Sequence, residues 1–311
     1  MDELSGAGHN SITQVKLAEA KQHCQFFAMD FDGTLSDGQQ HKTEDALALI
    51  QEILARGKTP GLITARAATA LKIFVPPLEE YYRHHQDAVS TYIAGGNGTV
   101  LFCLNARGLE QIYNYGLSLD EVKMMVAKWQ AYAEVNLQPK DLSEKGLATF
   151  KQFYSENWEQ FIPMAVLNIG RPFSGRIFTE EAKVTFMFPK DVARQAEVVM
   201  DMQKLIGNDF SVTAGDKHFC HMTRRLHEDS KRLAVQAILQ RLGLNENQVA
   251  TFGDMPHGND KGLLSFPVSF TNCEELSHTK NDPHVPPYLL LEPGVVPVAR
   301  VYKAIRYILK K

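Results

Sequence analysis

Apolar residues follow two alternating patterns along this chain: short continuous runs, and longer stretches in which they recur every three or four positions. The short runs predict buried strands, and the spaced stretches predict helices that pack one face against a sheet. Strands that alternate with helices favour an α/β fold, with a doubly wound, Rossmann-like parallel sheet as its core. The predicted strands are residues 26–29, 59–63, 249–252 and 267–270, and the predicted helices are residues 43–55, 67–74, 230–242 and 298–308.

Turn and breaker residues separate these elements. Thr43 offers a capping hydroxyl and acidic residues follow it, which predicts that a helix starts there. Pro76 and Pro77 predict the end of the next helix, because proline cannot continue the helical hydrogen bonding. Asn97 and Gly98 lie between two β-rich runs and predict a hairpin.

The pattern changes after about residue 116, where a helix is followed by several strand-like runs and another helix. We therefore expect an N-terminal extension at residues 1–24, a core built from residues 25–115 and 225–311, and an inserted α+β domain at residues 116–224. The elements predicted in the insert are helices at 119–135 and 191–206, and strands at 164–169, 175–178, 184–188, 210–213 and 218–222.

Composition narrows the class of protein. Of the 311 residues 44% are apolar, and the net charge of −3 gives no overall basic field, so we expect no nucleic-acid partner. The four cysteines are scattered without a Cys-x-x-Cys pair, which argues against a thiolate zinc site. No apolar run approaches the roughly 18 residues of a membrane span. The first residues also lack the pattern of a signal peptide, so we expect a cytoplasmic protein without a membrane partner.

Polar residues that could take part in catalysis or metal binding lie where the predicted strands end or a helix begins. Because parallel strands end at one edge of a sheet, side chains that follow different strands should meet there. Carboxylates on different loops suit Mg²⁺, and a phosphoryl group in transfer needs a cation, a hydroxyl or amide donor, and an ammonium. Taken singly, the same residues are also typical of an Asp-Gly turn, a strand-end threonine and an ordinary lysine in the first turn of a helix. The residues are Asp30, Asp32, Thr64, Lys231, Asp254, Asn259 and Asp260.

At these residues the chain resembles the haloacid dehalogenase superfamily of phosphohydrolases, in all four motifs and in order. The matching segments are Asp30-Phe31-Asp32-Gly33-Thr34-Leu35, Ile63-Thr64-Ala65-Arg66, Asp229-Ser230-Lys231, and Gly253-Asp254 through Asn259-Asp260. About 34 residues separate Asp30 from Thr64 and about 167 separate Thr64 from Lys231. The insert therefore falls between the second and third motifs, which is similar to the C2B caps of Cof-like proteins, sugar-phosphate phosphatases and phosphomannomutases.

The resemblance implies a role for each motif residue. Asp30 would be the nucleophile that forms an aspartyl-phosphate, and Asp32 would be the general acid and then the general base. The resemblance also implies that Thr64 and Lys231 bind the phosphoryl group. Mg²⁺ would be held by Asp30, by the backbone carbonyl of Asp32 and by Asp254, and Asn259 and Asp260 would support the site.

The implied function is Mg²⁺-dependent hydrolysis of a small phosphorylated metabolite, with a sugar phosphate as the expected substrate. Four residues stand between Asp254 and Asn259, a spacing that is similar to phosphomannomutases rather than to Cof-like proteins. A sugar phosphomutase is therefore an alternative, and a catalytically silent binding or regulatory protein is another. The sequence leaves the oligomeric state and the substrate open.

Overall fold

The computed structural model describes residues 4–66, 68–136, 184–187, 192–214, 219–226, 229–274, 276 and 285–310. The chain divides into two compact units, one of residues 1–114 with 228–311 and the other of residues 115–227. In the described part of the chain no helix combines the length and the apolar character needed to cross a membrane.

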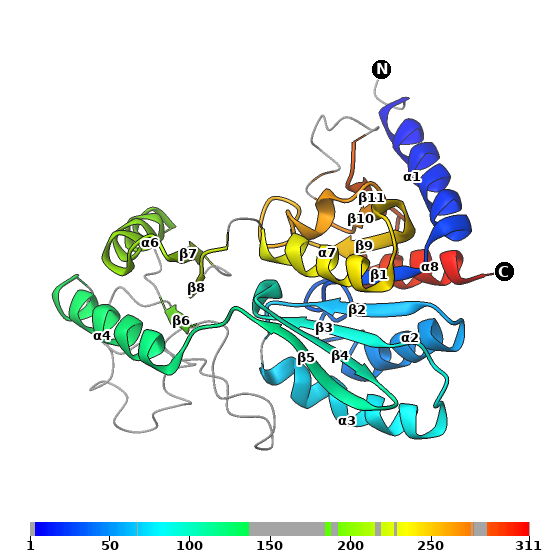
Figure 1. Ribbon diagram of the computed structural model, residues 1–311. Helices are drawn as coiled ribbons and strands as arrows, with labels where there is room; N and C mark the ends of the chain where they lie inside the picture. The colour runs from blue at the N-terminus through cyan, green and yellow to red at the C-terminus, as the bar shows by residue number, and fades with distance from the viewer. Residues whose placement is uncertain are drawn as a thin grey trace. The chain divides into compact units, whose positions relative to one another are not determined.

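The first unit is built on an eight-stranded sheet (Figure 1). Its strands are β1 (Phe26–Met29), β2 (Thr59–Ile63), β3 (Thr91–Gly95), β4 (Val100–Asn105), β5 (Gly108–Asn114), β9 (Val249–Gly253), β10 (Ser269–Thr271) and β11 (Tyr288–Leu289). Its helices are α1 (Leu4–His23), α2 (Thr43–Ala55), α3 (Ala68–His84), α7 (Ser230–Leu242) and α8 (Pro297–Leu309), with short 3-10 turns η1 (Gly96–Gly98), η4 (Glu246–Gln248) and η5 (Leu263–Ser265).

The strand order is β11-β10-β9-β1-β2-β3-β4-β5. The six strands from β11 to β3 run parallel, while β4 and β5 are antiparallel and make one edge of the sheet. The predicted α/β, Rossmann-like fold is therefore confirmed. The central strand β1 pairs with β2 on one side and β9 on the other, and Met29 lies opposite both Leu62 and Phe252. These strands end side by side, so the residues that follow them share one edge.

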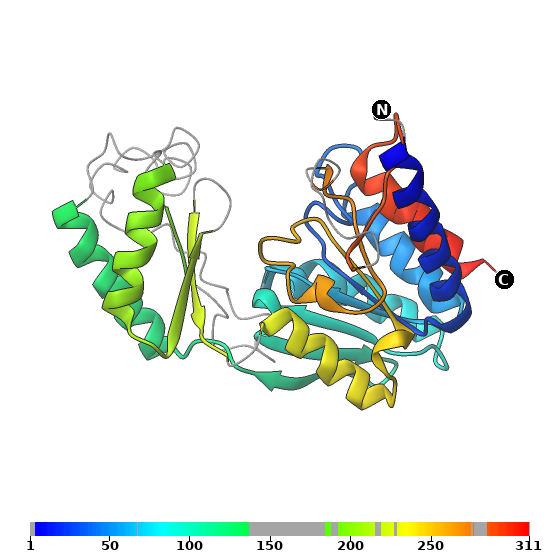
Figure 2. The ribbon, with the colours of Figure 1, turned by 90° about the horizontal axis from the view of Figure 1, so that it is seen from above.

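Helices cover both faces of this sheet. In β1 the side chains of Phe26 and Ala28 pack in a buried cluster with Ala234, Val235 and Ile238 of α7. Successive strand residues point to opposite faces, so the intervening side chains of β1 turn the other way. Figure 2 shows α7 on one side of the sheet and α2 and α8 on the other. The continuous apolar run of β1 is explained by this burial on both faces.

Two local predictions are wrong. Helix α3 runs through Pro76 and Pro77 instead of ending there. Its apolar stripe continues past the prolines to the buried side chains of Leu78 and Tyr82, and that burial outweighs the lost hydrogen bonds. Helix α2 does begin at Thr43, but its N-cap is Lys42, whose backbone N–H donates to the Asp45 carboxylate at 2.9 Å.

Other elements differ from the expected ones in extent. The predicted hairpin is confirmed as β3 and β4, joined by η1, in which Asn97 adopts a positive φ of 59°. Strands β5 and β11 were not predicted. Helix α1 begins at Leu4, lies within the predicted N-terminal extension, and packs against α8 and β11.

Among its described residues, the second unit pairs two helices with a three-stranded antiparallel sheet of order β6-β8-β7. A buried cluster that includes Trp129, Met202 and Met222 joins them. The strands predicted at 164–169 and 175–178 lie outside the described residues, and the identification of this unit as a C2-type cap stays a prediction. The elements are α4 (Leu119–Asn136), β6 (Val184–Met187), α6 (Val192–Ile206), β7 (Phe210–Ala214) and β8 (Phe219–Arg224).

Candidate active site

The site lies at the edge where β1 and β9 end. Asp30 directly follows β1, and its backbone N–H donates to the Phe252 carbonyl of β9 at 2.9 Å. Asp254 directly follows β9. Parallel pairing therefore brings together two carboxylates that stand more than 200 positions apart in the sequence, as the strand-end pattern predicts.

Lys231 joins two of the aspartates in a buried cluster. Its Nζ donates to Asp30 Oδ1 at 2.7 Å and to Asp260 Oδ1 at 2.5 Å. Asp30 is 3% exposed, and Lys231 and Asp260 are fully buried. Charges so far from water need partners at hydrogen-bond distance, and this ammonium supplies one to each carboxylate.

Lys231 is brought to this position by the start of α7. Asp229 is the N-cap of the helix, and its Oδ1 accepts from the backbone N–H of Lys231 at 3.0 Å. The N-terminal end of a helix dipole is positive, so a lysine in the first turn is electrostatically unfavourable. The two buried carboxylates supply the compensation for that placement.

Asp260 organises the loop that follows β9. Its Oδ2 accepts from the backbone N–H groups of Asp254 and Met255, both at 3.0 Å. A Cβ at Gly253 would stand only 2.8 Å from the same oxygen, so the close approach requires glycine. Asp260 therefore links the lysine to the backbone that carries Asp254.

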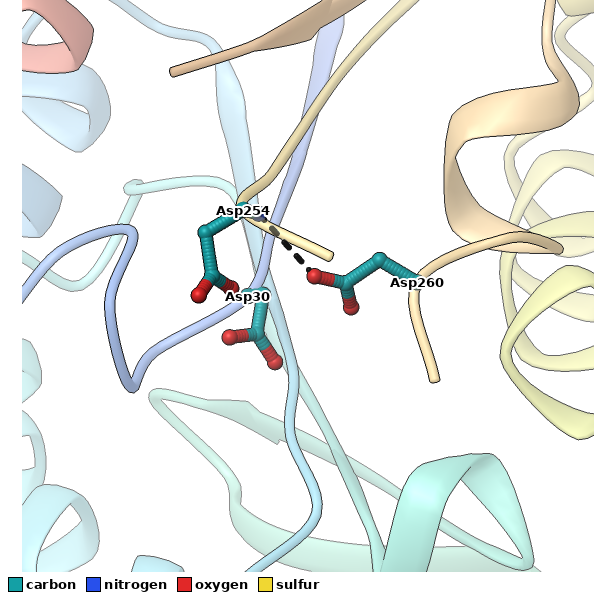
Figure 3. Close-up of side chains that lie close together, drawn as sticks. All are labelled: Asp30, Asp254 and Asp260. Atoms are coloured by element: carbon teal, nitrogen blue, oxygen red, sulfur yellow. Dashed lines mark hydrogen bonds between the residues drawn. The ribbon is translucent and has the colours of Figure 1, made fainter. Parts of the chain in front are cut away.

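The three aspartates fit a divalent cation. One carboxylate oxygen from each of Asp30, Asp254 and Asp260 lies within 4.8 Å of the others, and Figure 3 shows the three side chains gathered around one region. When all three are ionised, Lys231 offsets one negative charge and leaves an excess of two. Carboxylate oxygens at one point, with such an excess, are the donors that Mg²⁺ prefers.

The pKa values of these groups reflect burial and crowding of like charges. Burial raises the pKa of Asp254 to about 7, and the neighbouring Asp260 adds to that effect. Burial also raises the pKa of Asp30 well above its usual range, although Lys231 opposes the shift. Burial alone would lower the pKa of Lys231, but Asp30 and Asp260 outweigh it and keep the lysine charged.

Gly33 lets the loop after β1 approach Asp254. Its φ is +79°, and a Cβ there would stand 2.3 Å from Asp254 Oδ2. The buried hydroxyl of Thr34 donates to Asp254 Oδ1 at 3.4 Å. The glycine thus permits both the turn and the close packing of the loop on the carboxylate.

Asp32 has different surroundings from Asp30. Its carboxylate is outside the three-aspartate cluster and receives two hydrogen bonds from Arg66, from Nε at 2.8 Å and from an Nη at 2.6 Å. The Arg66 guanidinium also lies over the Phe31 ring, 4.9 Å from its centroid. This paired geometry fixes the direction of the Asp32 carboxylate.

The remaining predicted residues divide between burial and exposure. Thr64 follows β2, is buried, and its Oγ1 accepts from the Arg66 N–H at 3.1 Å. Asn259 is exposed, whereas its neighbour Asp260 is inside the cluster. The structure also brings in Arg66, Gly33 and Thr34, to which the sequence assigned no role although they stand within the quoted motifs.

Comparison with known proteins agrees with this geometry. The family model described as haloacid dehalogenase-like hydrolase matches residues 27–266, and the chain belongs to that family. The protein is therefore a hydrolase by its family. No curated protein matches the chain by sequence.

Solved structures share the fold at low sequence identity. A haloacid dehalogenase-like hydrolase from Bacteroides thetaiotaomicron is 19% identical, with a TM-score of 0.60 over 92% of this chain and 99% of that one. A putative HAD/COF-like hydrolase from Plasmodium vivax is 17% identical, with a TM-score of 0.58 over 94% and 98%. An IMP-nucleotidase from Plasmodium falciparum, solved with IMP bound, is 15% identical, with a TM-score of 0.51 over 96% and 73%.

Proposed function

We propose that this hydrolase is a Mg²⁺-dependent phosphomonoesterase that forms an aspartyl-phosphate on Asp30. The observation that carries the proposal is the buried contact of Asp30 with Lys231, beside Asp254 and at the end of β1. Asp30, Asp254 and the backbone carbonyl of Asp32 would hold the cation. When bound, Mg²⁺ would neutralise negative charge on the phosphoryl group and on the carboxylates around it.

In the first step an oxygen of Asp30 attacks phosphorus, and the bond from phosphorus to the ester oxygen breaks. The departing oxygen takes a proton from Asp32. Lys231 holds Asp30 by its Oδ1, at 2.7 Å, which leaves Oδ2 as the attacking atom. The ammonium also offsets charge on the transferred group, which is the role that such a group performs in phosphoryl transfer.

In the second step a water molecule attacks the phosphorus of the aspartyl-phosphate. Asp32 accepts the proton of that water, the acyl-phosphate bond breaks, and Asp30 returns to the carboxylate with release of phosphate. Asp32 has the exposure that both transfers need, since its side chain is 53% exposed. Arg66 holds the Asp32 carboxylate from one side and so orients it for the transfer.

The substrate is proposed to be a small phosphorylated metabolite, with sugar phosphates as the first class to test. The bound IMP of the Plasmodium nucleotidase adds nucleoside monophosphates to the panel. We further propose that the unit of residues 115–227 is the C2-type cap that selects the leaving group.

Hydrolysis of an aryl phosphate tests the reaction itself. The wild type should release phosphate only with Mg²⁺, and Asp30→Asn should lose activity by at least about a thousandfold, because no carboxylate remains to attack. Asp30→Asn should stay folded, because Lys231 keeps Asp260 as a buried carboxylate partner at 2.5 Å. Equal activity of the two proteins would remove Asp30 as the nucleophile.

The spacing of Asp254 and Asn259 favours one further candidate, a sugar phosphomutase. A mutase would transfer the phosphoryl group from a sugar bisphosphate to a sugar monophosphate without net phosphate release. Phosphate that accumulates in proportion to turnover would exclude it. Lack of both activities across a metabolite panel would favour a silent binding protein instead.

A further inference from the structure

Asn272 connects the C-terminal part of the core to the loop that carries Asp30 and Asp32. It directly follows β10, which pairs with β9 so that Thr271 lies opposite Gly253. Its Nδ2 donates to the backbone carbonyl of Gly33 at 2.9 Å, across 239 positions of sequence. Asn272 is 3% exposed and lies beyond the residues that the family model matches.

The hydrogen bond from Asn272 holds Gly33, which has the greatest conformational freedom of the residues in that loop. Gly33 has a φ of +79°, and glycine reaches many other conformations at little cost. Its N–H donates to the Ser36 carbonyl at 2.8 Å, and Asn272 holds its carbonyl. The two peptide planes on either side of Gly33 are each fixed by one hydrogen bond.

The first of these planes includes the Asp32 carbonyl. A trans peptide group is planar, and its C=O and N–H point in opposite directions. The direction of the Gly33 N–H therefore determines the direction of the Asp32 carbonyl, which the proposed function makes a cation ligand. If the Gly33 carbonyl were released, the glycine could rotate and carry the preceding plane with it.

Gly33 also sets how closely the loop approaches Asp254. The position of its missing Cβ is 2.3 Å from Asp254 Oδ2, so no side chain separates the loop from that carboxylate. Movement of Gly33 would change the separation of the β1 and β9 ligands. Asn272, which follows the strand next to β9, fixes the loop relative to Asp254.

The hydrogen bonding of Asn272 indicates that this residue positions the loop that contains Gly33 and does more than stabilise the core in general. Its Oδ1 is buried and has no hydrogen-bond partner among the residues that the structure describes. An unpartnered buried oxygen costs free energy, so the favourable hydrogen bond of this side chain is the one that its Nδ2 donates to the Gly33 carbonyl.

We propose that Asn272 is a positioning residue that holds the Gly33 carbonyl and thereby fixes the Asp30–Asp32 loop in its cation-binding geometry. The inference rests on the proposed function for the identity of the cation, Mg²⁺. The inference concerns the affinity of the site for Mg²⁺ and not the hydrolysis step, so it is tested by measuring Mg²⁺ binding.

The test is calorimetric titration of Mg²⁺ into the full-length wild type and N272D. N272D keeps the size of the side chain but turns an acceptor toward the Gly33 carbonyl. The dissociation constant for Mg²⁺ should rise about 10- to 100-fold, the range seen when a partner of a metal ligand is lost. In an aryl phosphate assay excess Mg²⁺ should restore kcat, with little change in the KM for the ester.

Ser269→Ala is the matched control. Ser269 is a buried residue of β10 that bonds to Thr251 and to the Phe266 carbonyl, away from the Gly33 loop. Its loss should lower the melting temperature without changing Mg²⁺ affinity. If N272D does not fold, the milder N272S decides in the same assay.

Mg²⁺ affinity of the folded variant equal to that of the wild type would overturn the inference. A wild type that binds no Mg²⁺ would overturn both the inference and the proposed function. A wild type that binds Mg²⁺ but hydrolyses no phosphate ester would contradict the proposed function alone, because the effect of N272D on binding would still be measured.

Discussion

Asp30 and Asp32 are two positions apart and occupy opposite surroundings. The side chain of Asp30 is 5% exposed and bonds to a buried ammonium, whereas the side chain of Asp32 is 53% exposed and bonds to a guanidinium near the surface. The buried pair is held by charge in a medium with little water, where the loss of one partner is costly. The exposed pair is screened by solvent and contributes mainly orientation. One short motif thus supplies a carboxylate built into the core and another that solvent reaches.

Replacement of the buried cation should have the largest effect. In Lys231→Met, Asp30 and Asp260 would remain buried without a counter-charge, so the free energy of unfolding should fall by about 3–5 kcal/mol and hydrolysis should be lost. Denaturant unfolding in metal-free buffer measures the change. Lys303→Met is the control, because Lys303 and Glu292 form an exposed pair worth less than about 1 kcal/mol. Similar losses in the two variants would contradict the contrast between buried and exposed pairs.

Replacement of Gly33, the residue after Asp32, tests how closely this loop packs against the buried cluster. In Gly33→Ala, a positive φ should cost about 1–2 kcal/mol for the backbone alone. The added Cβ would also meet the Asp254 carboxylate, so the total loss should be larger and Mg²⁺ affinity should fall. Gly38→Ala separates the two terms, since Gly38 has a φ of +70° and no atom of the described residues lies within 4 Å of its Cβ position. The comparison is made by unfolding and by Mg²⁺ titration, and equal losses would mean that the loop is not packed against Asp254.

Arg66→Ala tests the exposed pair. Stability should change by less than about 1 kcal/mol, because the pair is open to solvent. The kcat for an aryl phosphate should fall at least about tenfold, since the group that moves protons would lose its orientation. Arg306→Ala removes a comparable surface pair with Glu52 and should leave kcat unchanged. An Arg66 variant that loses stability but keeps its kcat would reverse the assignment.

Asn259→Ala should have the smallest effect. Asn259 is exposed, so its removal should change stability by less than about 0.5 kcal/mol and leave the Mg²⁺ dependence of hydrolysis as in the wild type. Asp260→Ala should act in the opposite way, because it removes an acceptor for two backbone amides and one partner of Lys231. A large loss of activity in the Asn259 variant would show that substrate contacts it.

The meeting of Asp30 and Asp254 could be predicted because it follows from the sheet alone. Parallel strands end at one edge, and carboxylates that follow two neighbouring strands, such as β1 and β9, therefore meet. The difference between Asn259 and Asp260 could not be predicted from two adjacent polar letters. It depends on the turn after Asp254, in which the Asp260 N–H donates to the Met255 carbonyl and the Asp260 side chain is carried inward. The ion pair of Asp32 and Arg66 could not be predicted either, because it joins two loops whose relative position the sequence does not determine.

The misplaced elements show where local signals give way to packing. Pro76 and Pro77 are strong breakers in isolation, but α3 buries apolar side chains on both sides of them and continues. Strand β5 lacks an apolar run because it lies at an edge, with most of its residues only half-buried. Strand β11 has two residues, Tyr288 and Leu289, too few to form a pattern.

The most direct test of the account is to find the phosphoryl group on the protein. Wild type mixed with an aryl phosphate and Mg²⁺, quenched in acid during turnover and digested, should yield a peptide that contains Asp30 and carries the mass of one added phosphoryl group. Asp30→Asn should yield none. Turnover with the phosphoryl group on another residue, or with none on the protein at any quench time, would contradict the assignment of Asp30 as the nucleophile.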